Sequence, residues 1–218
     1  MTTGEGRMTI AHRVGRIAGV VWRMELGVWR SLFRWATLRP RVPRGADAFS
    51  YDKPIRPVLI VFIVLSAIEI PIIDLIVHSW AAVRIPLLVL GIWGLTWMIG
   101  LLLGYLTRPH AVGPAGLRIR HGDETEIVVG WDDVASVAPL HEHIEGAKTF
   151  RIDGELLAIS VQQETNVEIE LEHPIVVPVN RKPQSVRVLR IWVDDRAAYL
   201  ASVRRSLHAW EDGLAARD

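Results

Sequence analysis

The stretch IPLLVLGIWGLTWMIGLLLGYL, residues 85–106, decides the fold of this chain, because it runs for 22 residues without a charged side chain or a histidine. At about 1.5 Å per residue, a helix of this length crosses the hydrocarbon core of a bilayer. A second apolar run, residues 58–77, lies just upstream, and only a short connection separates the two. The sequence therefore predicts a transmembrane helical hairpin, with spans at about 57–80 and 84–107.

The charges divide the chain into three parts. Residues 1–56 contain 11 Lys and Arg against 4 Asp and Glu, whereas residues 108–218 contain 13 against 18. We interpret these segments as a basic arm with a linker and as a cytoplasmic domain, joined by the hairpin at 57–107. Basic residues cluster outside both spans and the turn holds only Arg84, so both termini are expected in the cytoplasm. The sequence thus predicts a multi-pass protein of the cell (inner) membrane.

The arm has an amphipathic pattern between residues 9 and 38. On a helix, five arginines fall on one face, and apolar residues with flanking tryptophans occupy the other. This pattern favours anionic lipid headgroups as the partner, over packing of the apolar face on the hairpin or on another subunit. Nucleic acid is not expected as a partner, since phosphates would leave the tryptophans without a contact. Residues 39–57, rich in proline, are expected to be a linker. The basic stripe comprises Arg13, Arg16, Arg23, Arg30 and Arg34.

Polar side chains in or beside the first span need partners. A central carboxylate such as Glu69 opposes insertion by roughly 3 kcal/mol. If the hairpin turns near residue 82, Glu69 comes level with Thr96 and Trp97, which both carry hydrogen-bond donors. Asp74 and His78 are four residues apart and share a face near the outer interface. We interpret the trio as polar contacts between helices; the alternative is a proton, ion or substrate path.

The second span offers a packing surface for another helix. Thr96, Gly100 and Gly104 repeat every four residues, and the two glycines form a GxxxG motif. Small residues at this spacing let two helix backbones approach closely. The surface could receive the first span of the same chain or the same helix of a second copy.

The part after the hairpin alternates in hydrophobicity and predicts a β-rich domain closed by one helix. A hairpin begins at GLRIRH, followed by turn residues around Gly122. Asp194 or Asp195 is expected to cap the closing helix, whose core-facing stripe has helical spacing. That stripe comprises Leu200, Val203, Leu207 and Trp210. The seven predicted strands are 116–121, 126–129, 133–137, 157–162, 166–172, 175–179 and 186–193.

The segment GLRIRHGDETEIVVGWDDVASV resembles the opening of bacterial pleckstrin-homology-type domains that follow a membrane hairpin. The order of motifs over residues 57–210 is also similar to a family of uncharacterised bacterial two-span membrane proteins. This resemblance implies a PH-like seven-stranded β-barrel or sandwich closed by a C-terminal helix, and no activity. Phosphoinositide-binding pleckstrin domains use basic residues at the first hairpin, whereas Asp123, Glu124 and Glu126 stand here. No headgroup site is therefore expected in this domain.

Residues that could carry chemistry are few. The chain has no cysteine, which excludes thiolate ligands and a cysteine nucleophile. His141 and His143 could chelate zinc from an extended segment but lack a defined third ligand, and His110 is expected at a surface or an interface. No metal, cofactor or enzymatic activity is predicted. The expected role is a membrane-anchored protein-interaction or scaffold module, with a protein partner or a second copy; the alternative is a small accessory subunit of a transporter or channel that uses Glu69, Asp74 and His78.

Overall fold

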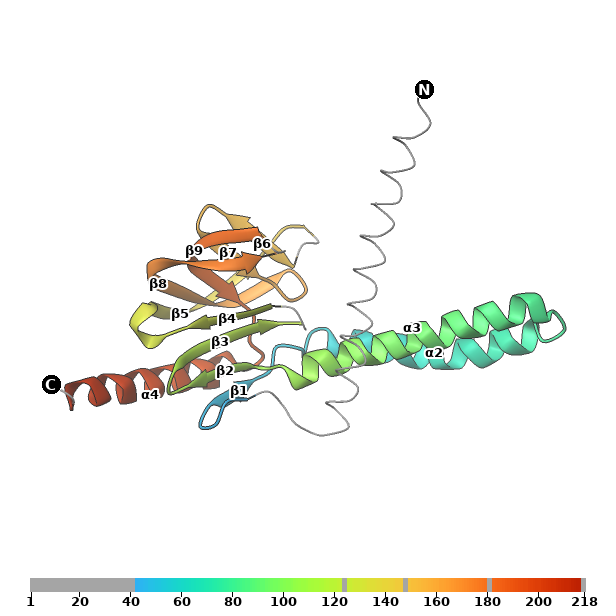
Figure 1. Cartoon of the computed structure of the whole chain (residues 1–218), viewed down its shortest axis with the longest axis horizontal. Coiled ribbons are helices and arrows are strands. Elements are labelled where there is room, and N and C mark those ends of the chain that lie inside the picture. The colour runs from blue at the N-terminus through green and yellow to red at the C-terminus, as the bar shows by residue number, and fades with distance from the viewer. Residues whose placement is uncertain (1–41, 123–124, 147–148, 180–181, 217–218) are drawn as a thin grey trace, which may run out of the picture. The chain divides into compact units, whose positions relative to one another are not determined.

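The computed structural model describes residues 42–122, 125–146, 149–179 and 182–216. Two compact units make up this part of the chain (Figure 1). Ile63–Gly104 form a helical unit, and the described residues up to Phe62 and from Tyr105 onward form a sheet unit. The arginine stripe of the N-terminal arm lies outside the described residues.

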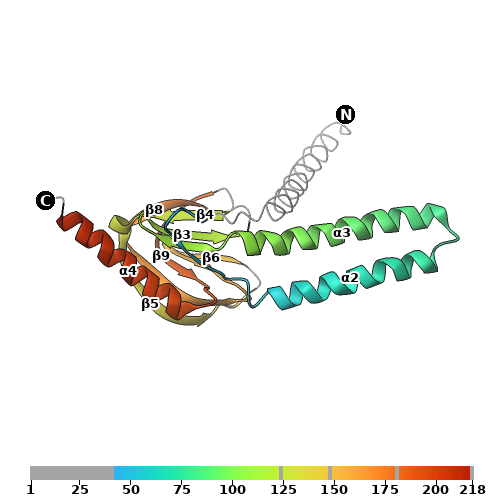
Figure 2. The same cartoon turned by 90° about the horizontal axis from the view of Figure 1, so that it is seen from below.

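Two helices account for the apolar runs. Helix α2 spans Arg56–Ile76 and helix α3 spans Ala81–Thr107, and they run alongside each other, joined by a short turn (Figure 2). Both are long and apolar enough to cross a membrane. None of the apolar window of α2 is buried, and only 17% of that of α3 is. Core helices of soluble proteins are mostly buried, so these surfaces fit hydrocarbon better than the interior of a soluble domain.

The sheet unit is built from two sheets that share one hydrophobic core. Core side chains such as Leu117 and Ile119 come from one sheet, and Leu157, Ile169 and Leu189 come from the other. The first sheet has the order β1 (Asp47–Phe49), β2 (His110–Gly113), β3 (Gly116–His121), β4 (Thr125–Val129). The second has the order β5 (Val134–His143), β8 (Glu164–Val179), β9 (Lys182–Ile191), β7 (Leu156–Ile159), β6 (Phe150–Asp153). Only β7 and β9 pair in parallel among these strands.

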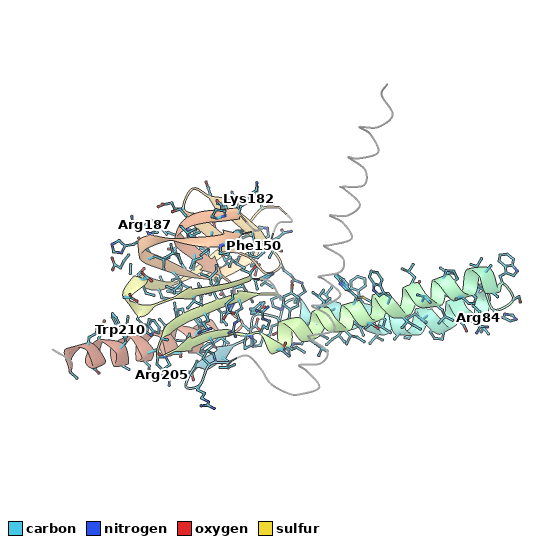
Figure 3. All side chains as sticks on the ribbon, viewed as in Figure 1. Arg84, Phe150, Lys182, Arg187, Arg205 and Trp210 are labelled. Carbon is cyan, nitrogen blue, oxygen red and sulfur yellow. The ribbon has the colours of Figure 1, made fainter. Side chains whose placement is uncertain are left out.

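Helix α4 (Arg196–Ala215) packs its apolar stripe on this core, beside β2 and β5. Asp195 caps the helix by accepting a hydrogen bond from Ala198 N at 3.0 Å, which satisfies one of the free amides of the first turn. Asp47 on β1 accepts hydrogen bonds from Ser202 Oγ at 2.7 Å and Arg205 Nη2 at 3.1 Å (Figure 3). These bonds fasten the first strand to the last helix.

The predicted architecture is confirmed in outline: two apolar helices are followed by sheets and a C-terminal helix. The strand pattern differs. The described residues form nine strands rather than seven, and neither sheet closes into a barrel. Two of the predicted strands, 166–172 and 175–179, are parts of the single strand β8. Residues 39–57, expected to be a linker, include strand β1 and the fully buried Tyr51.

Gly116 is required where β2 turns into β3. Its φ is +123°, and a Cβ there would stand 2.0 Å from Val129 O, which is backbone and cannot move away. We expect Gly116→Ala to lower the free energy of unfolding by about 2 kcal/mol or more. Gly122 is a matched control, because its φ is +58° and nothing lies within 4 Å of the added Cβ. Denaturant unfolding of the full chain in detergent measures both; equal losses would contradict the close contact.

Candidate functional site

A groove of about 240 Å³ lies between α2 and α3 within the helical unit. Most of its wall is aliphatic, but four polar side chains also line it. Polar groups between apolar helices are where function is expected in a membrane protein. The polar lining consists of Ser66, Glu69, Asp74 and Arg84.

Asp74 and Arg84 form a bidentate ion pair across the turn. Arg84 Nε donates to Asp74 Oδ1 at 2.5 Å, and Nη2 donates to Oδ2 at 2.9 Å. Arg84 lies at the turn end of the hairpin (Figure 3). His78, predicted to share a face with Asp74, has its ring bonded to Leu75 O at 2.9 Å and Ser79 Oγ at 3.2 Å. The only basic residue of the turn is therefore neutralised by a carboxylate of the same hairpin.

Glu69 does not meet the donors expected for it. Thr96 Oγ1 donates at 2.8 Å to Ile92 O, on its own helix. The turn lies nearer to α2 than the prediction assumed. Because Gly91 packs against Ile70, Glu69 faces residues of α3 that lie about four positions before Thr96. Four residues correspond to about 6 Å along a helix. The groove places Glu69 beside Gly91 and Gly94 instead.

The two helices also approach closely at Gly91, a residue that the sequence pattern did not single out. A Cβ on Gly91 would lie 2.9 Å from Ile70 Cγ1. The predicted GxxxG residues, Gly100 and Gly104, are buried but lie further from the turn. Gly91 and Gly94 are three residues apart, so this pair of glycines was the available signal.

A second, smaller groove of about 160 Å³ lies on the outer face of the four-stranded sheet. Ala111 and Gly113 contribute to its floor, and Val128 on edge strand β4 is 54% exposed beside it. Arg44 and Arg118 stand at its margins, and both reach solvent. An apolar floor beside the exposed cationic group of Arg44 suits a ligand that combines apolar and acidic groups.

Arginines converge on one carboxylate of this sheet. Arg118 Nη1 and Arg120 Nη2 donate to Glu126 Oε1 at 3.1 and 3.0 Å, and Arg108 Nη2 stands 4.0 Å from Oε2. Burial raises the pKa of Glu126, but the bonds and charges of Arg120 and Arg118 outweigh it, so its pKa lies below the ordinary value. Of the three acids expected to repel a phosphorylated headgroup at this hairpin, Glu126 is thus bound internally.

His110 is buried rather than at a surface. It is 2% exposed, and its ring lies 4.6 Å from that of Tyr51. Nδ1 accepts from Arg120 N at 3.0 Å, and Nε2 donates to Trp192 O at 3.1 Å, which fixes a neutral tautomer. Burial lowers the pKa of His110 to about 3 and that of His121 to about 4. These imidazoles hold the sheet unit together and do not exchange protons near neutral pH.

His141 and His143 lie in strand β5, where both are exposed. Glu142 between them pairs with Arg190 at 2.8 Å. Among the described residues there is no group of three or more His, Cys, Asp or Glu that could hold a metal ion.

Comparison with known proteins identifies no relative: no family model, no curated protein and no solved structure matches the chain.

The neutral state of His110 predicts a pH dependence of stability. Below about pH 6.5 the unfolded chain binds a proton at this residue and the folded chain does not, so the free energy of unfolding falls as the pH decreases. Between pH 6 and 4 the slope should be about 1.4 kcal/mol per pH unit from His110 alone. Unfolding of the full chain in detergent should show a shallower slope in His110→Gln, and an unchanged slope in the exposed control His173→Gln. Identical slopes in all three proteins would contradict the burial.

Proposed function

We propose that this chain is a membrane-anchored protein-interaction or scaffold module, in which the α2–α3 hairpin holds the sheet unit at the cytoplasmic face of the cell membrane. The exposed apolar surfaces of both helices support the anchor. The orientation is supported by the excess of basic residues outside the hairpin, since Arg84 is the one Lys or Arg between the two apolar runs.

The groove on the four-stranded sheet carries the interaction role. We propose that it receives a short segment of a partner protein in which an acidic residue follows an apolar one. The apolar residue would contact Val128, and the acid would meet the exposed guanidinium group of Arg44. The strand order supports this choice, since β4 is the last strand of its sheet and its free edge can pair with an extended peptide.

The likeness to pleckstrin-homology-type domains belongs to the same proposal. Two sheets around one core and a C-terminal helix support it. The open sheet edges distinguish the unit from a closed barrel.

The alternative, an accessory subunit of a transporter or channel, would use the groove between α2 and α3. Asp74 is already paired with Arg84 there, and two helices alone do not enclose a path. The pairing favours a structural role for Asp74.

Orientation can be tested with reporters fused after Asp218 and inserted at Ala82. We expect the first to report the cytoplasm and the second the opposite side. Opposite results at these two positions would show that the chain crosses the membrane between them, by α3. A C-terminal reporter outside the cytoplasm would remove the setting in which the sheet unit is proposed to act.

The interaction surface can be tested with a photo-crosslinking amino acid at Val128 in native membranes. We expect one protein adduct, reduced severalfold by Arg44→Glu because the reversed charge repels the acidic segment. Val176 is the matched control, since it is also a strand valine and is 72% exposed. Adducts of equal yield at both positions, or an adduct that Arg44→Glu leaves unchanged, would overturn the proposed surface.

A further inference from the structure

The carboxyl group of Glu69 lacks a hydrogen-bond partner within the hairpin. It lines the groove between α2 and α3, and no residue in the described part of the chain forms a hydrogen bond or ion pair with it. In hydrocarbon a polar group without a partner is unfavourable, and water cannot replace the missing bond. A donor from outside the hairpin would complete this site.

The groove has open space beside Glu69. At Gly91 the space is filled by Ile70 of the same hairpin, whereas nothing lies within 4 Å of a Cβ added at Gly94. The two glycines therefore differ: the first lets α2 and α3 approach each other, and the second leaves a hollow on the open side of the groove. Ser66, one turn before Glu69, lines the same side.

We propose that the open side of this groove is the contact surface between two copies of the chain, with Glu69 of each copy hydrogen-bonded to Glu69 of the other. This inference rests on the membrane location proposed above. A neutral carboxyl group both donates and accepts hydrogen bonds, so it is complementary to a second copy of itself. In hydrocarbon, a hydrogen-bonded pair of neutral carboxyl groups is less costly than a charged carboxylate.

The membrane adds a geometric reason for choosing a second copy. Two copies inserted with the same topology are related by a twofold axis along the membrane normal, and equivalent residues then lie at the same depth. Glu69 therefore meets its counterpart at the same level without any adjustment of register. In a different partner protein, symmetry would not place a hydrogen-bond donor at this depth.

Disulfide crosslinking tests the contact directly, because the chain has no cysteine of its own. Ser66→Cys places a thiol in the groove, and Ala67→Cys is a matched control on the exposed side, outside the lining. After oxidation of native membranes we expect a disulfide-linked dimer from Ser66→Cys and severalfold less from Ala67→Cys. Equal yields from the two variants would overturn the proposal, and so would a crosslink from Ser66→Cys to a different protein.

The role of Glu69 is tested in the Ser66→Cys background. Glu69→Leu should lower the dimer yield by about threefold to thirtyfold, the range that one interhelical hydrogen bond gives. Glu69→Gln should retain it, since an amide also donates and accepts. Gly94→Leu, which fills the hollow, should lower it as well. If Glu69→Leu gives the same dimer yield as Ser66→Cys alone, the proposed hydrogen bond between the two Glu69 carboxyl groups is overturned.

These experiments distinguish a failure of the proposed contact between copies from a failure of the proposed scaffold function. If the Val128 adduct forms and Ser66→Cys gives no dimer, the groove proposal alone fails. If the dimer forms and the reporters or the Val128 adduct disagree, the scaffold proposal fails while the contact between copies stands.

Discussion

The uncovered apolar surface of α2 is the constraint on which the rest of the structure depends. Leu75 and Ile76 are each 73% exposed, and no residue of this helix is buried. In water, apolar surface costs about 25 cal/mol per Å², so a row of such side chains would be strongly unfavourable. A helix satisfies its own backbone groups, and hydrocarbon accepts its side chains. The polar parts of the chain must then gather in the sheet unit, at the turn, or in contacts between helices.

Elements defined by local pattern were predictable from the sequence. Strand β3 occupies the predicted residues 116–121, and Asp195 caps α4 as expected. Strand β8 was divided in two because His173 and Pro174 interrupt its alternation. Both residues lie within a shift of register between Glu170 and Ile175. A strand tolerates proline at such an irregularity, because the missing N–H is not needed for a ladder hydrogen bond there.

Elements that depend on distant pairing were not predictable. Strand β1 has three residues, and its only sheet partner, β2, lies beyond the whole hairpin in sequence. His110 likewise looked isolated, because Tyr51 and Trp192, which cover and bind it, are far away along the chain. In the hairpin, the residues that face Glu69 were predicted wrongly because the turn is closer to α2 than assumed. A shift of a few residues in the turn changes every pair of residues that face each other across the two helices.

The two carboxyl groups of α2 show how depth decides what a hairpin can provide for itself. Asp74 lies five residues nearer the turn than Glu69, a distance of about 7.5 Å along the helix. Arg84, near the start of α3, reaches Asp74 there, where the charged group of an arginine can remain close to the interface. The same arginine at the level of Glu69 would have to be carried into the hydrocarbon core, at a cost that one ion pair does not offset. A charge near the interface can thus be matched within the chain, whereas the deeper carboxyl group is better matched by another neutral group at its own depth.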